Sequence, residues 1–300
     1  MSLPEIPISV AVPAYLRLEQ LRVTLSRLMS CDPLPMEILV HLDGNDKKLR
    51  NLVEVEFPSV RLLHSNELIG PGGARNRLMR EARCSWVAHF DDDSFPADGD
   101  FFARAWKLIL QHPDSAVFAA TILPVETLDS QGLWLQAHYV GCGHLMSRDW
   151  FLRTLGYLPV PIAYNLEEVD VSLQLHELGG LCLQSGDLRV YHDHPVPLRE
   201  TEDTQVAMMI NTVLFPLIRY PLPLLLQAVG SVLRRLLRLA LKGEWRVIGR
   251  FLWALPAAIR HYLPLRAPVR TSTAWSWLLM RREPLRVALT SKHSSLSVRG

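Results

Sequence analysis

The sequence lacks the features that mark several protein classes. Its four cysteines lie far apart and none forms a Cys-x-x-Cys pair, which favours buried thiols in a reducing compartment over a disulfide framework or a zinc site. No apolar run reaches the roughly 18 residues of a membrane-spanning helix. The first ten residues show no basic segment followed by an apolar one, so we expect no signal peptide and a cytoplasmic protein.

Acidic residues are scarce in the last third of the chain. Residues 201–300 hold 15 Lys and Arg but only four Asp and Glu, a balance of +11, whereas residues 1–200 have a balance of −9. We therefore expect an acidic body over residues 1–200 and a basic, amphipathic helical region over residues 201–300. Such a split indicates contact with an anionic surface. No nucleic-acid-binding motif accompanies the charge, so we expect no nucleic-acid partner.

The basic region has helical spacing. Its cations recur at four-residue steps among leucines and tryptophans, and Gly243 is expected to divide it into two helices; the cations are Arg234, Arg238, Lys242, Arg246 and Arg250. Cationic amphipathic helices of this kind lie in membrane interfaces, which predicts a peripheral position on the cytoplasmic face of an anionic membrane. The alternative is a helical extension packed on the body, with its basic face in water.

Short β-branched runs alternate with helical patterns in the first half of the chain. This alternation predicts an α/β fold with a mostly parallel sheet flanked by helices. We expect strands at 8–12, 36–42, 60–64, 86–90 and 115–123, and helices at 18–29, 74–82 and 100–112. Ligands of such sheets bind beyond the carboxyl ends of the strands. Pro13, Asp43 and the run of three aspartates at 91–93 follow strand ends, so we expect them to meet in one crevice.

Three adjacent carboxylates, Asp91, Asp92 and Asp93, need a reason to be together because like charges repel. A divalent cation would offset that repulsion, and such cations bind one or two carboxylates together with substrate phosphates. On an extended backbone Asp91 and Asp93 share one side. The alternative is a solvated acidic turn before the next helix.

The order of the motifs resembles that of family-two glycosyltransferases, which have the GT-A fold and use nucleotide-sugar donors. The similar segments span about residues 6–195: VAVPAYLR, VHLDGND, NELIGPGGARN, HFDDDSFP, GCGHLMSRDWFLRTLGYL, NLEEVDVSLQLHELG and RVYHDHP. Four positions depart from the family pattern. Leu16 replaces Asn, Leu42 and Glu168 each replace Asp, and Gln174 replaces Arg.

The resemblance implies a nucleoside-diphosphate-sugar donor and a divalent metal, Mn²⁺ or Mg²⁺. The implied donor-binding residues are Pro13, Tyr15, Arg17, Asp43, Arg75, Asp91 and Asp92, with Asp43 at the nucleobase and Arg75 at the diphosphate. The implied metal ligands are Asp91, Asp93 and His192, of which His192 matches the family better than the nearby His194. Asp43 can equally serve only as a turn former.

The resemblance also implies an inverting transfer to a hydroxyl of a glycan or lipid-linked acceptor, as in cell-envelope polysaccharide synthesis. A carboxylate within reach of that hydroxyl can take its proton. Glu168 occupies the position of the family's base, with Glu167 and Asp170 as alternatives. Acidic residues also favour the first turn of any helix through its dipole. A nucleotidyltransferase and a noncatalytic membrane adaptor with the same fold remain as other functions.

Overall fold

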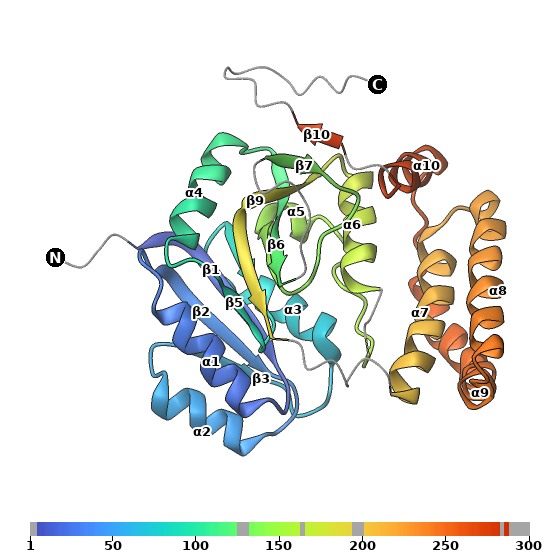
Figure 1. Ribbon diagram of the computed structural model, residues 1–300, viewed down its shortest axis with the longest axis horizontal. Coiled ribbons are helices and arrows are strands. Elements are labelled where there is room, and N and C mark those ends of the chain that lie inside the picture. The colour runs from blue at the N-terminus through green and yellow to red at the C-terminus, as the bar shows by residue number, and fades with distance from the viewer. Residues whose placement is uncertain (1–4, 125–131, 163–165, 194–200, 283–284, 288–300) are drawn as a thin grey trace.

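The computed structural model describes residues 5–124, 132–162, 166–193, 201–282 and 285–287. Within these residues ten strands form one sheet (Figure 1). The strands are β1 (Ile6–Ala14), β2 (Pro35–Leu42), β3 (Arg61–His64), β4 (Trp86–His89), β5 (Ser94–Pro96), β6 (Ser115–Leu123), β7 (Leu133–Leu135), β8 (His144–Ser147), β9 (Leu181–His192) and β10 (Leu285–Val287). They are ordered β10-β7-β9-β6-β8-β4-β1-β2-β3, and β5 pairs with β9.

The centre of the sheet is parallel. Strands β3, β2, β1 and β4 run in one direction, as do β6 and β9, while β8 runs antiparallel between β4 and β6. β1 and β4 are nearly continuous apolar runs because both faces of a parallel sheet are covered. The register pairs Ala11 with His89, so the segments that follow β1 and β4 leave the same edge of the sheet. The predicted α/β fold with a mostly parallel sheet flanked by helices is confirmed.

Helices cover both faces of the sheet. One face packs against α1 (Leu18–Met29), α2 (Lys47–Glu56) and α4 (Phe101–Gln111), and the other against α3 (Gly70–Glu81), α5 (Arg148–Leu152) and α6 (Glu167–Glu177). α1 presents Leu21, Leu25 and Leu28 to the core, at the spacing of one helix face. α2 was not predicted. It begins because the Asp46 carboxylate caps the backbone N–H groups of Lys48 and Leu49.

α3 begins four residues earlier than the sequence pattern indicated. Gly70, Gly72 and Gly73 form its first turn with Pro71, and Gly70 has φ +71°. A Cβ at Gly70 would collide with the carbonyl oxygen of Val160. The glycines therefore allow α3 to pack closely against the segment before α6, which brings these two helices together at the carboxyl edge of the sheet.

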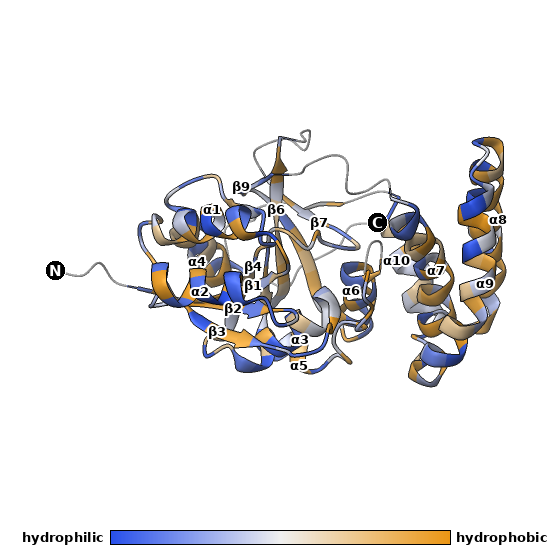
Figure 2. Cartoon of the chain, turned by 90° about the horizontal axis from the view of Figure 1, so that it is seen from below, coloured by the Kyte–Doolittle hydropathy of each residue, from blue (hydrophilic) through white to orange (hydrophobic). Residues whose placement is uncertain are grey.

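The C-terminal region is mostly helical within the described residues, and its strand β10 joins the sheet beside β7. It contains α7 (Glu202–Arg219), α8 (Leu225–Leu241), α9 (Trp245–Tyr262) and α10 (Thr271–Met280), with single turns η2 (Leu222–Leu224) and η3 (Leu263–Leu265). Gly243 separates α8 from α9 as predicted, whereas Pro216 lies inside α7 and does not end it. α7 and α10 share an apolar core with α6, and α8 and α9 pack on α7 as the outermost layer (Figure 2). None of the described helices combines the length and apolarity needed to cross a membrane.

Candidate active site

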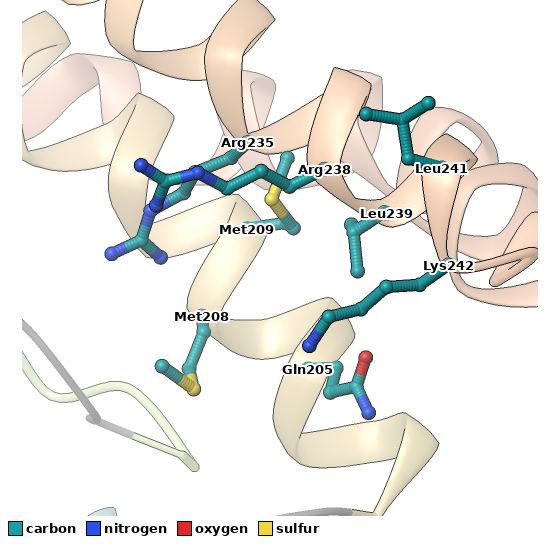
Figure 3. Close-up of a pocket in the computed structure, with 8 residues that line it drawn as sticks. All are labelled: Gln205, Met208, Met209, Arg235, Arg238, Leu239, Leu241 and Lys242. Carbon is teal, nitrogen blue, oxygen red and sulfur yellow. The ribbon is translucent and has the colours of Figure 1, made fainter.

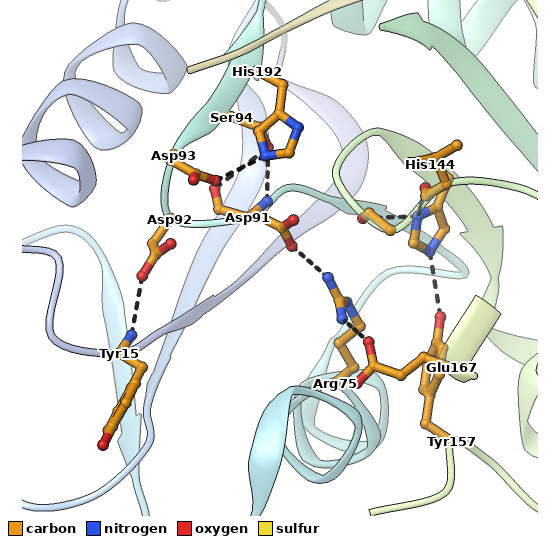
Figure 4. Close-up of polar contacts among 12 residues, drawn as sticks. Tyr15, Arg75, Asp91, Asp92, Asp93, Ser94, His144, Tyr157, Glu167 and His192 are labelled. Carbon is orange, nitrogen blue, oxygen red and sulfur yellow. Dashed lines mark hydrogen bonds and ion pairs between the residues drawn. The ribbon is translucent and has the colours of Figure 1, made fainter. Parts of the chain in front are cut away.

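The aspartate run follows β4, and Figure 4 shows Asp91 facing Arg75 and Asp93 facing His192. Asp92 accepts hydrogen bonds from Arg17 Nη1 at 3.1 Å and from the backbone N–H of Tyr15 at 3.0 Å. Asp93 is paired with Arg17, and its Oδ1 lies 3.1 Å from His192 Nε2. Burial raises the pKa of Asp92 to about 7, although Arg17 opposes this shift. The segment after β1 thus supplies the charge that offsets the repulsion within the run.

Asp91 has a different partner. Arg75 of α3 reaches it with Nη2, while its Nη1 donates to Glu167 Oε2 at 2.6 Å. The Arg75 side chain is only 3% exposed, and its guanidinium lies between the two carboxylates. Burial raises the pKa of Glu167, and the adjacent Arg75 opposes that effect. One buried arginine therefore joins the aspartate run to the start of α6.

The three acidic residues at the start of α6 occupy different surroundings. Glu167 is buried against Arg75, and Asp170 is buried in an ion pair with Arg219 of α7. Glu168 alone keeps part of its surface exposed. Burial raises its pKa, Arg75 and two backbone N–H groups lower it, and Asp91 raises it further. Of the three carboxylates predicted as bases, Glu168 is the one that a substrate can reach.

Gly141 makes room for Glu168. A Cβ at this position would overlap Glu168 Oε1, and would lie 3.1 Å from Arg75 Nη2. The Gly141 backbone N–H is also one of the groups that favour the ionised form of Glu168. Sequence reasoning did not single out Gly141, although it stands in the quoted Gly-Cys-Gly segment. The pair of glycines in that segment was the available signal.

One cluster has the composition of a metal site. Asp91, Cys142 and His192 each offer a ligand atom, and the three atoms lie within 4.8 Å of one another. The structure thus brings Asp91 and His192 together as predicted, and it adds Cys142, which sequence reasoning missed. Asp93 contacts His192 from the side, and His194 lies outside the described residues. Carboxylate, imidazole and thiol groups are all donors to divalent cations, so these residues fit a metal ion.

A buried histidine holds the loop that carries Gly141 and Cys142. His144 Nδ1 lies 3.1 Å from the carbonyl oxygens of Val140 and Gly141, which only accept hydrogen bonds, so Nδ1 carries the proton. Its Nε2 then accepts from the Tyr157 hydroxyl at 3.4 Å. Burial lowers the pKa of His144 to about 3, so the ring stays neutral. The network fixes the backbone beside the carboxylates.

Asp43 holds the start of α3. Its Oδ1 accepts from Ser65 Oγ at 3.0 Å and from the Ile69 N–H at 2.8 Å, and its Oδ2 accepts from the Gly70 N–H at 2.8 Å. Asp43 remains half-buried. The carboxylate therefore does more than form a turn, because it ties the end of β2 to the helix that carries Arg75.

The segment after β1 is the exposed wall of the site. Pro13 is half-buried, Tyr15 is 46% exposed and Arg17 is half-buried. Leu16 between them has φ +59°, in the left-handed region that a leucine rarely adopts. Strain of this kind gathers at functional sites.

Comparisons with known proteins bear on this site. Residues 9–153 match the family model described as glycosyl transferase family 2. No curated protein matches the sequence. Among solved structures, the mannosyltransferase PcManGT from Pyrobaculum calidifontis with GDP-Man and Mn²⁺ is 14% identical, with a TM-score of 0.57 over 93% of this chain and 88% of that one.

Two further structures are similar in fold. GalNAc-T7 with UDP, GalNAc and Mn²⁺ is 13% identical, with a TM-score of 0.58 over 73% of this chain and 49% of that one. S. aureus TarS 1-349 in complex with UDP-GlcNAc is 16% identical, with a TM-score of 0.52 over 69% of this chain and 65% of that one. The architecture of this chain is therefore that of the GT-A glycosyltransferases.

Proposed function

Residues 9–153 make this chain a member of glycosyl transferase family 2, and from that premise we propose an inverting, metal-dependent sugar transfer. The donor is a nucleoside-diphosphate sugar and the acceptor is a hydroxyl group of a glycan or a lipid-linked sugar, in polysaccharide, glycan or glycolipid synthesis. Solved structures of similar fold that contain GDP-Man or UDP with Mn²⁺ support this donor and a divalent cation.

The observation that carries the proposal is the position of Arg75. It contacts Asp91, a member of the candidate metal cluster, and Glu167, the neighbour of the partly exposed Glu168. In an inverting displacement the metal-bound leaving diphosphate and the base lie on opposite sides of one sugar carbon, and Arg75 links the carboxylate of the metal cluster to the helical turn that carries the base. Because its guanidinium is buried between them, we assign Arg75 a positioning role in place of the predicted diphosphate contact.

On the donor side, Asp91 and His192 would hold the cation, with Cys142 and Asp93 beside them. A divalent cation such as Mn²⁺ or Mg²⁺, when bound there, offsets the charge that develops on the leaving diphosphate. Arg17 is half-buried and lies at the same edge, so its guanidinium can turn from Asp92 and Asp93 toward phosphate. We propose that Pro13, Tyr15 and Asp43 border the nucleotide.

On the acceptor side, Glu168 is the proposed base. An alcohol is a weak nucleophile at neutral pH, and a carboxylate that takes its proton during attack accelerates the step by about 10²–10⁴-fold. Glu167 and Asp170 are each engaged by a buried arginine, which leaves Glu168 to accept the proton. Attack from the side opposite the leaving group inverts the configuration of the sugar carbon.

A donor panel tests the proposal. Purified protein is incubated with several nucleotide sugars and Mn²⁺ or Mg²⁺, and the released nucleoside diphosphate is measured. Asp91→Asn should lose metal-dependent nucleotide binding and turnover together. Release of pyrophosphate would instead indicate nucleotidyl transfer, and the absence of any donor binding would favour a noncatalytic adaptor.

We also propose that the chain divides into a catalytic domain over residues 1–200 and a helical region over residues 201–300 that contacts an anionic membrane surface. One apolar stripe runs along α8, formed by the exposed residues Leu226, Val229, Leu233, Leu237 and Leu241. Beyond it, Trp245 and Trp253 of α9 are 65% and 87% exposed. Leucines and tryptophans next to basic residues suit a membrane interface. Liposome binding that persists in high salt, and is lost in Leu233→Gln/Leu237→Gln, would support this contact.

A further inference from the structure

A pocket of about 420 Å³ lies between α7 and α8, outside the candidate active site (Figure 3). Met208 and Met209 of α7 and Leu239 of α8 form its apolar part. Its polar rim consists of Gln205 of α7 and three cations from α8 and its end, Arg235, Arg238 and Lys242. An apolar hollow edged by positive charge fits an amphiphile with an anionic head.

The three cations have no carboxylate partner within the described part of the chain. The acidic residues at the start of α7, Glu202 and Asp203, are instead paired with Arg250 of α9. Burial and repulsion from Arg238 both lower the pKa of Arg235. Arg235 is partly removed from water, whereas Arg238 and Lys242 are exposed, and a partly buried cation beside another cation is unfavourable unless an anion joins them.

The position of the cations on α8 indicates which kind of anion. At about 100° per residue, α8 has three sectors around its axis. One packs on α7 and α9 through Val232, Leu236 and Leu239, and a second is the apolar stripe defined above. Arg235, Arg238 and Lys242 occupy the third, on the other side of the packed sector from the stripe, and Leu241 at the end of the stripe lines the pocket beside them. A ligand in the pocket can therefore place its charged end at the cations, and its apolar part can reach the exposed stripe of α8.

We propose that this pocket binds the phosphate head group of an anionic lipid, whose chains lie against the apolar stripe. Guanidinium groups suit phosphate because their planar donors match its oxygens, and the apolar part of the pocket and the stripe suit the lipid chains. A soluble phosphate would use the cations but not the stripe. The inference rests on the proposed membrane contact and is independent of the proposed chemistry.

The test uses the full chain and a lipid phosphate that stays monomeric in water. Calorimetry compares dihexanoyl phosphatidic acid below its micelle concentration, tail-less glycerol 3-phosphate, and a polyglutamate peptide. The pocket variant is Arg235→Gln/Arg238→Gln. The matched control is Arg234→Gln/Arg246→Gln, which removes the same charge from exposed positions outside the pocket.

We expect the short-chain lipid to bind about tenfold more tightly than glycerol 3-phosphate, because the chains add apolar burial. The pocket variant should lose about tenfold or more in affinity for it, since two charge-assisted contacts are removed, while the control stays close to wild type. If both variants lose the same affinity for the short-chain lipid, binding depends on net positive charge alone, and the proposed pocket site is overturned. If glycerol 3-phosphate binds as tightly as the short-chain lipid, the ligand is a free phosphate and the lipid proposal is overturned. If polyglutamate binds more tightly than the lipid, the partner is an acidic protein and the lipid proposal is likewise overturned.

Thermal unfolding of both variants controls for folding. Binding of nucleoside diphosphate with Mn²⁺ is measured on the same samples and should be unchanged in both variants. Failure of nucleotide binding in the wild type would reject the proposed transfer and leave the lipid site standing. Lipid binding that fails while the nucleotide still binds would reject the lipid site alone.

Discussion

Arg219 of α7 forms a two-pronged ion pair with Asp170 of α6. Its Nη2 donates to Asp170 Oδ2 at 3.1 Å and its Nε donates to Oδ1, and both side chains are almost completely buried. Asp170 follows Glu167 and Glu168 within the same helical turn. The C-terminal helices are therefore fastened to the element that carries the proposed base, so a disturbance of α7 is expected to reach the active site.

The first prediction concerns the stability of this junction. Arg219→Met leaves the Asp170 carboxylate buried without its cation, which should lower the free energy of unfolding by about 3–5 kcal/mol. Arg250→Met is the control, because it removes only exposed ion pairs with Glu202 and Asp203, which water screens. Urea unfolding measures both. Similar small losses in the two variants would show that the Asp170 pair does not fasten α7.

The second prediction concerns the pH dependence of transfer. Burial raises the pKa of Glu168, and a base works only when it is ionised. Turnover should therefore fall as the pH drops through this raised pKa. The acidic limb of the profile of turnover against pH should lie at a higher pH than the pKa of an ordinary glutamate. The profile is recorded at saturating metal and donor.

Glu168→Gln isolates that limb. It should lower turnover by about 10²-fold or more and remove the acidic limb, with donor affinity little changed. Glu168→Asp should keep the limb at a reduced rate, because the carboxylate is present but shorter. A limb that is unaltered in Glu168→Gln would move the base to another residue.

The third prediction concerns Gly141. Gly141→Ala places a methyl group where Glu168 Oε1 lies, so the carboxylate must turn away. We expect transfer to fall by about 10²-fold, as for the loss of a positioned base, while nucleoside-diphosphate binding persists. Gly143→Ala is the control within the same loop, since the atoms nearest to its methyl group belong to the apolar side chains of Ile122 and Val190 and not to Glu168. Equal losses in the two variants would indicate general disturbance of the loop.

The fourth prediction concerns Cys142. Thiolate ligation of Co²⁺ produces an intense charge-transfer absorption in the near ultraviolet, which carboxylate and imidazole ligands do not. Wild type titrated with Co²⁺ and a nucleoside diphosphate should show this band, because Cys142 lies with Asp91 and His192 in one cluster. Cys142→Ser should lose the band, and Cys182→Ser, a buried thiol of β9, should keep it. A wild type without the band would exclude Cys142 as a ligand.

The sequence predicted those features of the fold and of the site that depend on local residue patterns. Strand ends were visible because apolar runs stop at polar residues, and parallel neighbours bring those ends together, as Asp92 and Tyr15 illustrate. The local pattern could not distinguish Glu167, Glu168 and Asp170, because all three are acidic residues of one helical turn, and only the family resemblance favoured Glu168. Their difference comes from Arg75 and Arg219, which lie 92 and 49 residues from their partners in the chain. Such pairings are decided by packing, which short motifs do not encode.

The last prediction concerns Leu16, where the sequence departs from the Asn of the family pattern. Its φ of +59° is costly for leucine, by about 1 kcal/mol, while asparagine adopts this region readily. Leu16 is 64% exposed, so its replacement loses little apolar burial. Leu16→Asn should therefore raise the free energy of unfolding by about 0.5–1 kcal/mol. Leu155→Asn is the control, because Leu155 is 67% exposed and lies outside the left-handed region. Nucleotide affinity should be kept or improved, since Tyr15 and Arg17 stand on either side of the relaxed residue. If Leu16→Asn destabilises the protein as much as the control does, the left-handed backbone at Leu16 carries no strain.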